Sequence, residues 1–213
     1  MKAGQEMDLV VRGVAVGPLE TNAWIVGSRR SGDGVVIDPG ADVDLIRAAA
    51  RKVGISPRRI LITHGHFDHV GAAAALSRAT GAPVYLHRED SFWIERLVEQ
   101  TEAFGFPAPE KPVVGGYLAE GEEVSAGGIP LKILHVPGHS PGHVAFVTEG
   151  HVFAGDCLFA GSVGRTDLPG GSAEILISSI RKKLLVLPET TAVHPGHGPD
   201  TTIGREKRDN PFL

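Results

Sequence analysis

The stretch Thr63-His64-Gly65-His66-Phe67-Asp68-His69 follows directly on the apolar run Ile60-Leu61-Ile62. It places three imidazoles and one carboxylate within residues 64–69. Imidazole nitrogens and carboxylate oxygens are ligands for zinc, iron and manganese in proteins. A strand that runs into such a loop is a rigid support for metal ligands. The stretch therefore predicts a metal-binding loop at the end of a strand.

Three further apolar segments also run into loops that carry a ligand-type side chain. Glycine stands beside each of these side chains, which allows sharp turns and a close approach of the backbone. If one sheet brings the four strand ends together, seven ligands gather around one spot. That set is sufficient for two metal ions, each with an open position for water or substrate. The segments and their ligand-type residues are 131–136 with His139, 152–154 with Asp156, and 192–194 with His197.

The 213 residues have mixed charge and ordinary apolar content, which suits one sizeable domain or two small ones. Because no linker or repeat divides the chain, we expect a single domain over residues 1–213. The formal net charge of −4 argues against nucleic acid or an anionic membrane as a partner. The polar start and the lack of a long apolar run argue against a signal peptide and a membrane segment. With one cysteine, nothing calls for an oxidising compartment, so we expect a cytoplasmic protein. Its expected partner is a small molecule, and the sequence leaves the oligomeric state open.

Hydrophobic periodicity and turn residues predict an alternation of strands and helices. Asp42 is expected to cap the first helix through its side chain. Residues 104–116, with three prolines and three glycines, are expected to form a loop. The predicted helices are 42–53, 70–80, 88–102 and 172–187. The predicted strands are 9–16, 23–27, 35–37, 59–63, 84–86, 122–125, 129–136, 144–148, 151–154 and, as the last of the chain, 191–194.

Longer motifs surround the ligand-type residues. They are Pro137-Gly138-His139-Ser140-Pro141-Gly142-His143, Ala154-Gly155-Asp156-Cys157-Leu158-Phe159 and Gly164-Arg165-Thr166-Asp167. Together with the histidine loop, these motifs resemble the metallo-β-lactamase superfamily, and within it the small branch similar to glyoxalase II, the hydroxyacylglutathione hydrolases. The resemblance extends from Gly17 to Gly198. It implies an α+β fold, a four-layer αββα sandwich.

The same resemblance implies a site for two divalent metal ions, which can be zinc, iron or manganese. The residues that it assigns to the first ion are His64, His66 and His139. Those that it assigns to the second ion are Asp68, His69 and His197, with Asp156 as the bridge between the two ions.

The implied activity is hydrolysis of a thioester such as S-lactoylglutathione by a metal-activated hydroxide. Asp68 and Asp156 are the candidate catalytic residues, and Asp68 is expected to orient the attacking water. A thiolate leaves without a strong proton donor, so no general acid is expected. Arg165 is a candidate for binding an anionic group of the substrate. The alternative for its guanidinium is an ion pair with Asp167 or Asp156.

Two residues near the motifs are expected to have supporting positions. Metal-bound imidazoles usually donate their second N–H to an acceptor. Asp38, at a strand end, is a candidate for such an acceptor, with a helix cap or turn as the alternative. Cys157 is expected to point away from the metals as a small buried side chain.

The chain departs from full-length glyoxalase II in two ways. It ends at Leu213 without room for the C-terminal helical domain, and the lysine and tyrosine contacts to glutathione are not recognisable beside Gly164-Arg165-Thr166-Asp167. The main alternative activity is that of a mononuclear iron persulfide dioxygenase, a family that shares this run. We favour hydrolysis because Pro195-Gly196-His197-Gly198-Pro199 resembles the hydrolase form of the last motif. The sequence argues less for a β-lactamase or lactonase, a nuclease, or a metal-binding module without activity.

Overall fold

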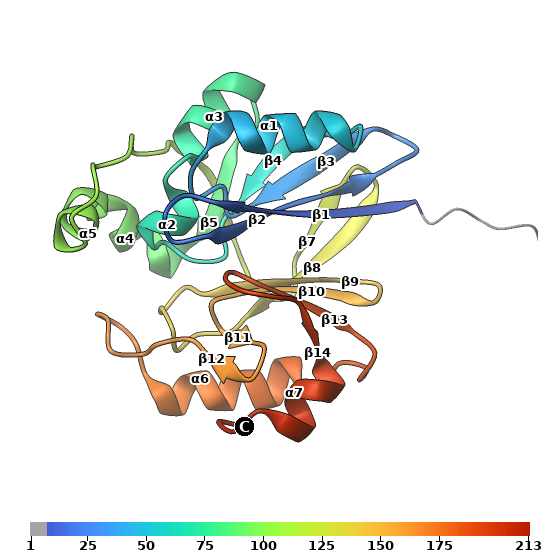
Figure 1. The fold of residues 1–213 in the computed structure, drawn as a ribbon, viewed down its shortest axis with the longest axis vertical. Helices are drawn as coiled ribbons and strands as arrows, with labels where there is room; N and C mark the ends of the chain where they lie inside the picture. Colours follow the sequence, from blue (N-terminus) through green and yellow to red (C-terminus); the bar gives the residue numbers. More distant parts are fainter. Residues whose placement is uncertain (1–7) are drawn as a thin grey trace, which may run out of the picture.

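Two six-stranded β-sheets face each other, and helices cover the outer face of each sheet (Figure 1). The structure, a computed structural model, describes residues 8–213. The αββα sandwich expected from the sequence is confirmed. Among the described residues, no helix has the length and apolar character needed to cross a bilayer.

The first sheet is mixed. Its first three strands are antiparallel, and its last four run parallel to one another. The central strands are continuous runs of valine, isoleucine and leucine because both of their faces are buried. In spatial order the strands are β1 (Leu9–Val16), β2 (Thr21–Ser28), β3 (Asp33–Ile37), β4 (Ser56–Leu61), β5 (Val84–His87) and β6 (Val114–Leu118).

The second sheet is antiparallel except for one parallel pair, β10 with β13. A small hairpin of β11 (Leu158–Phe159) and β12 (Ser162–Val163) lies between them in the chain. In spatial order the strands of the sheet are β14 (Thr201–Thr202), β13 (Ala192–Pro195), β10 (His151–Gly155), β9 (Val144–Thr148), β8 (Ile129–His135) and β7 (Glu123–Ala126).

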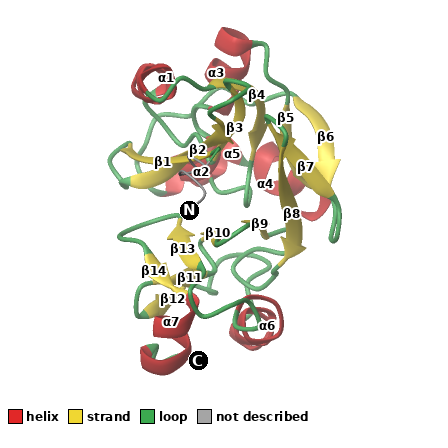
Figure 2. Ribbon diagram, turned by 90° about the vertical axis from the view of Figure 1, so that its right-hand side faces the viewer, coloured by secondary structure: helices red, strands yellow, loops and turns green. Residues whose placement is uncertain are grey.

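Three hydrophobic cores fill the spaces between the four layers. The core between the sheets contains Phe146 and Phe153, both without exposed surface. The outer cores lie under the helices, with Ile46 of α1 in one and Leu176 of α6 in the other (Figure 2). The helices are α1 (Val43–Lys52), α2 (Phe67–Val70), α3 (Ala73–Thr80), α4 (Ser91–Glu95), α5 (Leu97–Ala103), α6 (Ala173–Ser179), which continues as a π-helical turn (Ile180–Leu184), and α7 (Ile203–Asp209).

The prediction that the side chain of Asp42 caps the first helix is wrong. Asp42 does precede α1, but its side chain makes no cap hydrogen bond. Its backbone is left-handed (φ 49°), and Oδ2 accepts a hydrogen bond of 2.8 Å from the backbone N–H of Gly17. The carboxylate therefore ties the β1–β2 loop to the start of the helix instead of capping it.

Three other predicted boundaries differ from the structure. Part of the expected loop 104–116 forms β6, where Gly116 lets the strand pass the ring of Tyr85; a Cβ at this glycine would lie 2.6 Å from the ring. The single helix expected over 88–102 is broken at Arg96, because the side chain of Gln100 takes the carbonyl of Trp93 (2.8 Å). The strand at 191–194 is not the last element, since β14 and α7 follow it.

The four ligand-bearing strand ends belong to two sheets and not to the single sheet considered as a way to gather the ligands. β4 belongs to the first sheet, whereas β8, β10 and β13 belong to the second. The ends meet because the sheets are joined at this end of the sandwich. The carbonyl of Thr63 accepts from the N–H of Val144 (2.8 Å), and that of Gly196 accepts from the N–H of Asn22 (2.7 Å).

Candidate metal centre

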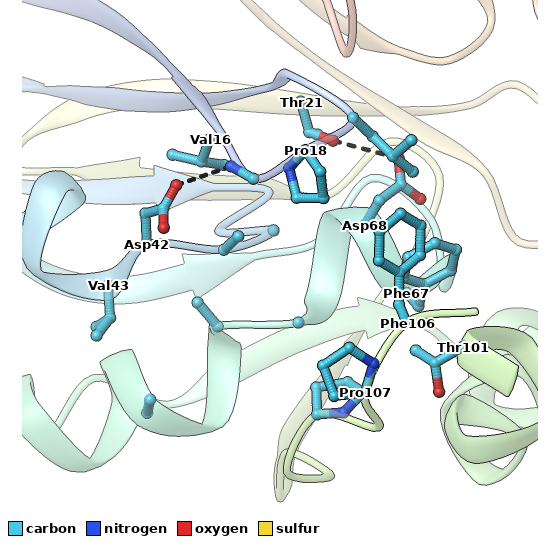
Figure 3. A pocket seen from close by; sticks show the side chains of 18 of the residues that line it. Val16, Pro18, Thr21, Asp42, Val43, Phe67, Asp68, Thr101, Phe106 and Pro107 are labelled. Atoms are coloured by element: carbon cyan, nitrogen blue, oxygen red, sulfur yellow. Dashed lines mark hydrogen bonds between the residues drawn. The ribbon is translucent and has the colours of Figure 1, made fainter. Parts of the chain in front are cut away.

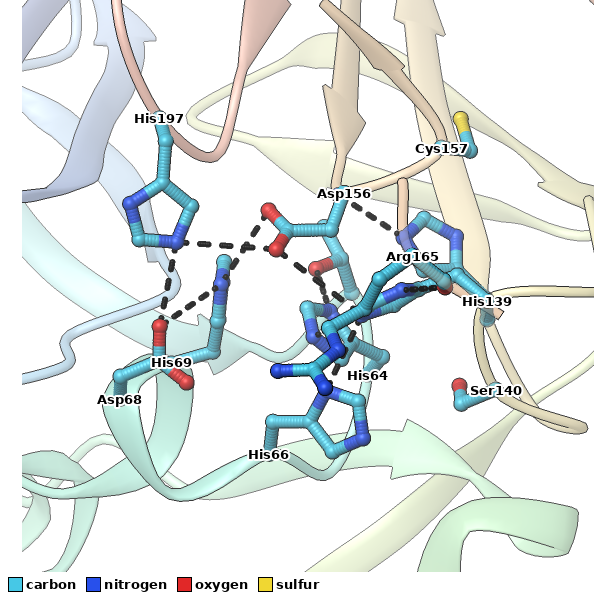
Figure 4. Close-up of polar contacts among 12 residues, drawn as sticks. His64, His66, Asp68, His69, His139, Ser140, Asp156, Cys157, Arg165 and His197 are labelled. Carbon is cyan, nitrogen blue, oxygen red and sulfur yellow. Dashed lines mark hydrogen bonds and ion pairs between the residues drawn. The ribbon is translucent and has the colours of Figure 1, made fainter. Parts of the chain in front are cut away.

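All seven side chains that the sequence predicts as metal ligands lie together at one end of the sandwich (Figure 4). Those from the first sheet are His64 and His66, in the loop after β4, and Asp68 and His69, in α2. Those from the second sheet are His139, Asp156 and His197, which follow β8, β10 and β13.

The first group consists of three buried imidazoles, His64, His66 and His139. Nε2 of His139 lies 3.1 Å from Nε2 of His64 and 3.0 Å from Nδ1 of His66. Nitrogens held about 2.0–2.1 Å from a tetrahedral ion lie roughly 3.3 Å from one another. The three nitrogens therefore have the spacing of ligands around a single ion.

Hydrogen bonds on the far sides of these rings direct two lone pairs toward each other. Nδ1 of His139 lies 2.8 Å from the carbonyl oxygen of Arg165, which can only accept, so Nδ1 carries the proton. Nδ1 of His64 lies 3.0 Å from the Thr63 hydroxyl, which donates its own hydrogen to Asp38 (2.6 Å). This nitrogen is then a donor as well. The two Nε2 lone pairs, 3.1 Å apart, repel each other unless a cation lies between them.

A proton does not meet this need near neutral pH. Burial, reinforced by the neighbouring imidazoles, lowers the pKa of His64 well below its usual value. Burial likewise lowers the pKa of His66 to about 3. Both rings are neutral at pH 7, so the cation that suits this group is a metal ion.

The second group consists of Asp68, His69 and His197, and Asp156 lies between the two groups. Oδ2 of Asp68 lies 3.1 Å from Nε2 of His197 and 3.5 Å from Nε2 of His69. Asp156 lies against both groups, and its Oδ2 is also 3.6 Å from Nε2 of His197. Its Oδ1 lies 3.3 Å from Nε2 of His69, and its Oδ2 lies 3.8 Å from Nε2 of His139. This position suits a carboxylate that bridges two ions.

The second group has a strong attraction for positive charge. Burial alone lowers the pKa of His69, but three carboxylates outweigh burial and raise it well above its usual value. These carboxylates belong to Asp156, Asp68 and Asp38. Burial also opposes protonation of His197, whose pKa is nevertheless raised by its hydrogen bond to Asp68. Without metal, imidazolium protons thus take the place that suits a divalent ion.

Buried atoms without partners point to the same place. Within residues 8–213, Nε2 of His69 and Oδ1 of Asp156 are buried and lack a hydrogen-bond partner. Buried polar atoms are rarely left unpaired in folded proteins. The seven side chains therefore fit two divalent ions, and a set of nitrogen and oxygen donors accepts zinc, iron and manganese alike.

Asp38 occupies the supporting position expected for it. Its Oδ2 lies 2.9 Å from Nδ1 of His69, and its Oδ1 accepts the backbone N–H of Thr63 (2.7 Å). The residue is 1% exposed, and its backbone is left-handed (φ 50°), which is strained for a residue other than glycine. The contact to His69 directs Nε2 of that ring toward the second group.

The side chain of Arg165 makes the ion pair that was the alternative to substrate binding. Its guanidinium binds the carboxylate of Asp167 through two hydrogen bonds of 2.7 Å, and the pair is half-exposed. The backbone of the same residue supports the site, since its carbonyl accepts the Nδ1–H of His139. The guanidinium still borders the cavity above the metal ligands.

Two further residues support the site, and one of them, Asp90, was missed by the sequence-based reasoning. Asp90 is completely buried, and its carboxylate accepts the backbone N–H of Gly65 (2.8 Å) and of Gly142 (2.6 Å). Burial raises its pKa. Nε2 of His143, also buried, accepts the backbone N–H of Asp156 (3.0 Å). In the sequence, Asp90 is indistinguishable from an acidic residue at the start of a helix, whereas His143 is part of a quoted motif.

A further group of ligand-type side chains, His87, Glu89 and His135, is less suited to a metal ion. The two rings stack at 4.3 Å with an interplanar angle of 11°. Lone pairs that lie in nearly parallel planes do not converge on one ion. Nε2 of His135 is in addition 2.8 Å from the carbonyl oxygen of Pro141.

The metal ligands open into a cavity of about 510 Å³, which we call the site cavity. This volume is in the usual range for small-molecule sites. Its walls combine aromatic and charged side chains around the ligands. Beside the ligands, these include Trp93, Phe104, Arg96, Glu99 and Arg165.

Residues 16–197 match the Metallo-beta-lactamase superfamily, a span that contains all seven side chains. The chain belongs to the metallo-β-lactamase superfamily. One relative in this superfamily, the hydroxyacylglutathione hydrolase GloC of Haemophilus influenzae, is 43% identical over 182 residues, which are 84% of this chain and 86% of the relative. Membership in the superfamily supports a hydrolase that uses metal ions.

Solved structures of the superfamily agree with this fold. The B3 metallo-beta-lactamase BLEG-1 superposes with a TM-score of 0.89 at 38% identity, over 96% of this chain and 99% of BLEG-1. TTHA1623, solved in a di-iron-bound form, has a TM-score of 0.86 at 45% identity, over 95% of this chain and 100% of TTHA1623. ETHE1 from Myxococcus xanthus has a TM-score of 0.78 at 26% identity, over 95% of this chain and 83% of ETHE1.

Proposed function

We propose that this protein is a single-domain, metal-dependent hydrolase of thioesters, with S-lactoylglutathione as the first substrate to test. The observation that carries the proposal is the convergence of five imidazoles and two carboxylates on two adjoining ion positions, with Asp156 between them. The hydroxyacylglutathione hydrolase GloC supports the choice of a thioester. The substrate is a small molecule, and the cytoplasm is the proposed location on the sequence argument alone.

In this proposal the first ion is held by the three imidazoles of the first group and the second by Asp68, His69 and His197. Bound divalent ions supply an activated water and a positive charge beside the thioester carbonyl. Zinc, iron and manganese are the proposed metals.

The chain's own residues position the reaction. Oδ2 of Asp68 accepts a hydrogen bond from the Thr21 hydroxyl (3.2 Å) and lies 3.1 Å from Nε2 of His197, the nitrogen that would bind the second ion with it. The carboxylate is thereby oriented to accept a hydrogen bond from the attacking water and to hold its proton. The carbon–sulfur bond breaks as the carbon–oxygen bond forms, and the thiolate leaves without a dedicated proton donor. Arg165, on the rim of the site cavity, is the proposed contact for an anionic group of the substrate.

The second candidate function is persulfide dioxygenation by a single iron. The run Gly164-Arg165-Thr166-Asp167, which that family shares, and the similarity to ETHE1 favour it. Two assays on metal-reconstituted protein separate the candidates, one of S-lactoylglutathione hydrolysis and one of oxygen uptake with glutathione persulfide. Thioester hydrolysis with two ions per chain supports the proposal. Oxygen uptake with one iron per chain overturns the proposal. Nitrocefin, a β-lactam, is the third substrate to assay, because BLEG-1 is named a B3 metallo-beta-lactamase.

A further inference from the structure

A second cavity, of about 520 Å³, adjoins the site cavity and is almost entirely apolar (Figure 3). We call it the apolar cavity. It lies between the β1–β2 loop, the start of α1, the α2–α3 segment and the loop after α5. Its apolar side chains include Val16, Pro18, Val43, Phe67, Ala75 and Phe106.

The apolar cavity ends at the candidate metal centre. Leu19, Phe67 and Asp68 line both cavities, so they form a common wall. Figure 3 shows Thr21 and Asp68 at one end of the apolar cavity, with Val43 toward the other. The apolar space therefore lies directly beside the position that a reacting group would take next to Asp68.

The few polar side chains in its wall have partners within the protein. The Thr101 hydroxyl donates to the carbonyl of Leu97 (3.0 Å), and the Thr21 hydroxyl donates to Asp68 (3.2 Å). The carboxylate of Asp42 accepts the N–H of Gly17 (2.8 Å). A polar arm would lose its bonds to water here without gaining equivalent ones, whereas an apolar arm gains from leaving water.

We infer that the apolar cavity binds the acyl chain of the substrate, which makes apolar acyl thioesters the substrate class of this site. The inference rests on the proposed function. The reaction is the same, in that water adds to the acyl carbon and the carbon–sulfur bond breaks. One proton of the water ends on the thiol, and the other is released to solvent as the fatty carboxylate forms. The cavity acts on the acyl part alone, so chain length is the property that it selects.

Two alanines of α3 give matched variants. Ala75 lines the apolar cavity, whereas Ala79, one turn further along the same helix, is exposed to solvent. Ala75→Phe fills the cavity, and Ala79→Phe adds the same ring outside it. The substrates are the octanoyl and acetyl thioesters of N-acetylcysteamine, which share the leaving thiol and differ only in the chain.

The measured quantity is the ratio of kcat/KM for the octanoyl ester to that for the acetyl ester. We expect a ratio of at least about 10 in the parent protein, an approximately tenfold lower ratio in Ala75→Phe, and no change in Ala79→Phe. A ratio near one in the parent protein, or equal ratios in both variants, overturns the inference while leaving thioester hydrolysis in place. Thermal unfolding of both variants confirms that they fold.

A binding measurement separates this inference from the proposed function. Octanoate is titrated calorimetrically into metal-free protein, so that no turnover is needed. We expect binding with a negative heat-capacity change, weakened about tenfold or more in Ala75→Phe and kept in Ala79→Phe. If neither thioester is hydrolysed but this pattern holds, the proposed function fails and the apolar site stands. Octanoate binding that is equal in both variants overturns the site.

Discussion

The buried carboxylate of Asp90 accepts a hydrogen bond of 2.7 Å from the hydroxyl of Ser140. Ser140 follows His139, and the N–H of Gly65, between His64 and His66, donates to the same oxygen of Asp90 (2.8 Å). One carboxylate without exposed surface thus joins the two loops that carry the first group of imidazoles. The spacing of the three nitrogens depends on this link between the sheets.

Replacement of Asp90 by alanine is expected to damage the first ion position more than the second. The Asp90→Ala change leaves the donors of Gly65, Ser140 and Gly142 buried without an acceptor. We expect the free energy of unfolding to fall by at least about 3 kcal/mol and about one ion per chain to be lost. Urea unfolding and metal analysis measure the two effects. The control is Asp44→Ala, which removes a carboxylate that is 91% exposed. An unchanged metal content in Asp90→Ala would contradict the positioning role of Asp90.

Replacement of Asp156 is expected to affect both ions, because its carboxylate lies beside nitrogens of both groups. Nε2 of His197 faces the carboxylates of Asp68 (3.1 Å) and Asp156 (3.6 Å). After dialysis against a weak chelator, we expect Asp156→Ala to retain much less than about one ion per chain and His197→Ala to retain about one. Equal metal content in Asp156→Ala and the parent protein would refute the bridging position.

Replacement of Asp38 tests the support behind His69. Asp38→Asn removes the charge that faces Nδ1 of this ring at 2.9 Å, and its single amide oxygen can replace only one of the two carboxylate oxygens that contact Thr63 and His69. We expect the affinity for the second ion to fall by about 10–100-fold, as is typical for the loss of such an acceptor. Competition with a chromogenic chelator measures the affinity. Asp33→Asn, at the other end of β3 and paired with Arg58 on the surface, is expected to bind metal as the parent protein does.

The side chain of Cys157 is expected to be unreactive although it follows the bridging residue. The thiol has no exposed surface, packs in the core under α6, and donates to the carbonyl of Ala154 (2.9 Å). Burial raises its pKa, so the reactive thiolate is not formed near neutral pH. We expect no reaction with dithionitrobenzoate at pH 8 in the native protein and one thiol per chain in guanidinium chloride. Rapid modification of the native protein would place the side chain in the site cavity instead.

Local sequence was sufficient for the ligands but not for what holds them. Residues 64–69 carry their own pattern, and Asp38 stands at a strand end where a support is expected. Asp90 gives no such signal, because its partners lie in loops that are distant in the sequence and meet only across the two sheets. The strand β6 was hidden for a similar reason. Its glycines argue for a loop, and only the neighbouring Tyr85 explains why they are tolerated in a sheet.

The stability of the metal-free protein is expected to fall as the pH drops from 6.5 to 4.5. An unfolded histidine takes up a proton near pH 6.5, whereas burial holds the pKa of His66 at about 3 and that of His64 well below its usual value. The unfolded chain then binds more protons than the folded one, so acid favours unfolding. His69, with a raised pKa, stays protonated in the folded state and opposes this slope only near pH 6.5, where the unfolded residue is partly deprotonated.

His66 by itself is expected to lower the free energy of unfolding by about 2–3 kcal/mol between pH 6.5 and 4.5. Urea unfolding of metal-free protein at several pH values measures it. In His66→Gln the dependence is expected to be shallower, because the substituted side chain takes up no proton in either state. A steeper fall in the metal-loaded protein is expected, since acid then also displaces the ions from their imidazoles. A metal-free protein whose unfolding free energy is constant over this range would mean that these rings are protonated in the folded state, and that a proton, not a metal ion, separates the lone pairs of His64 and His139.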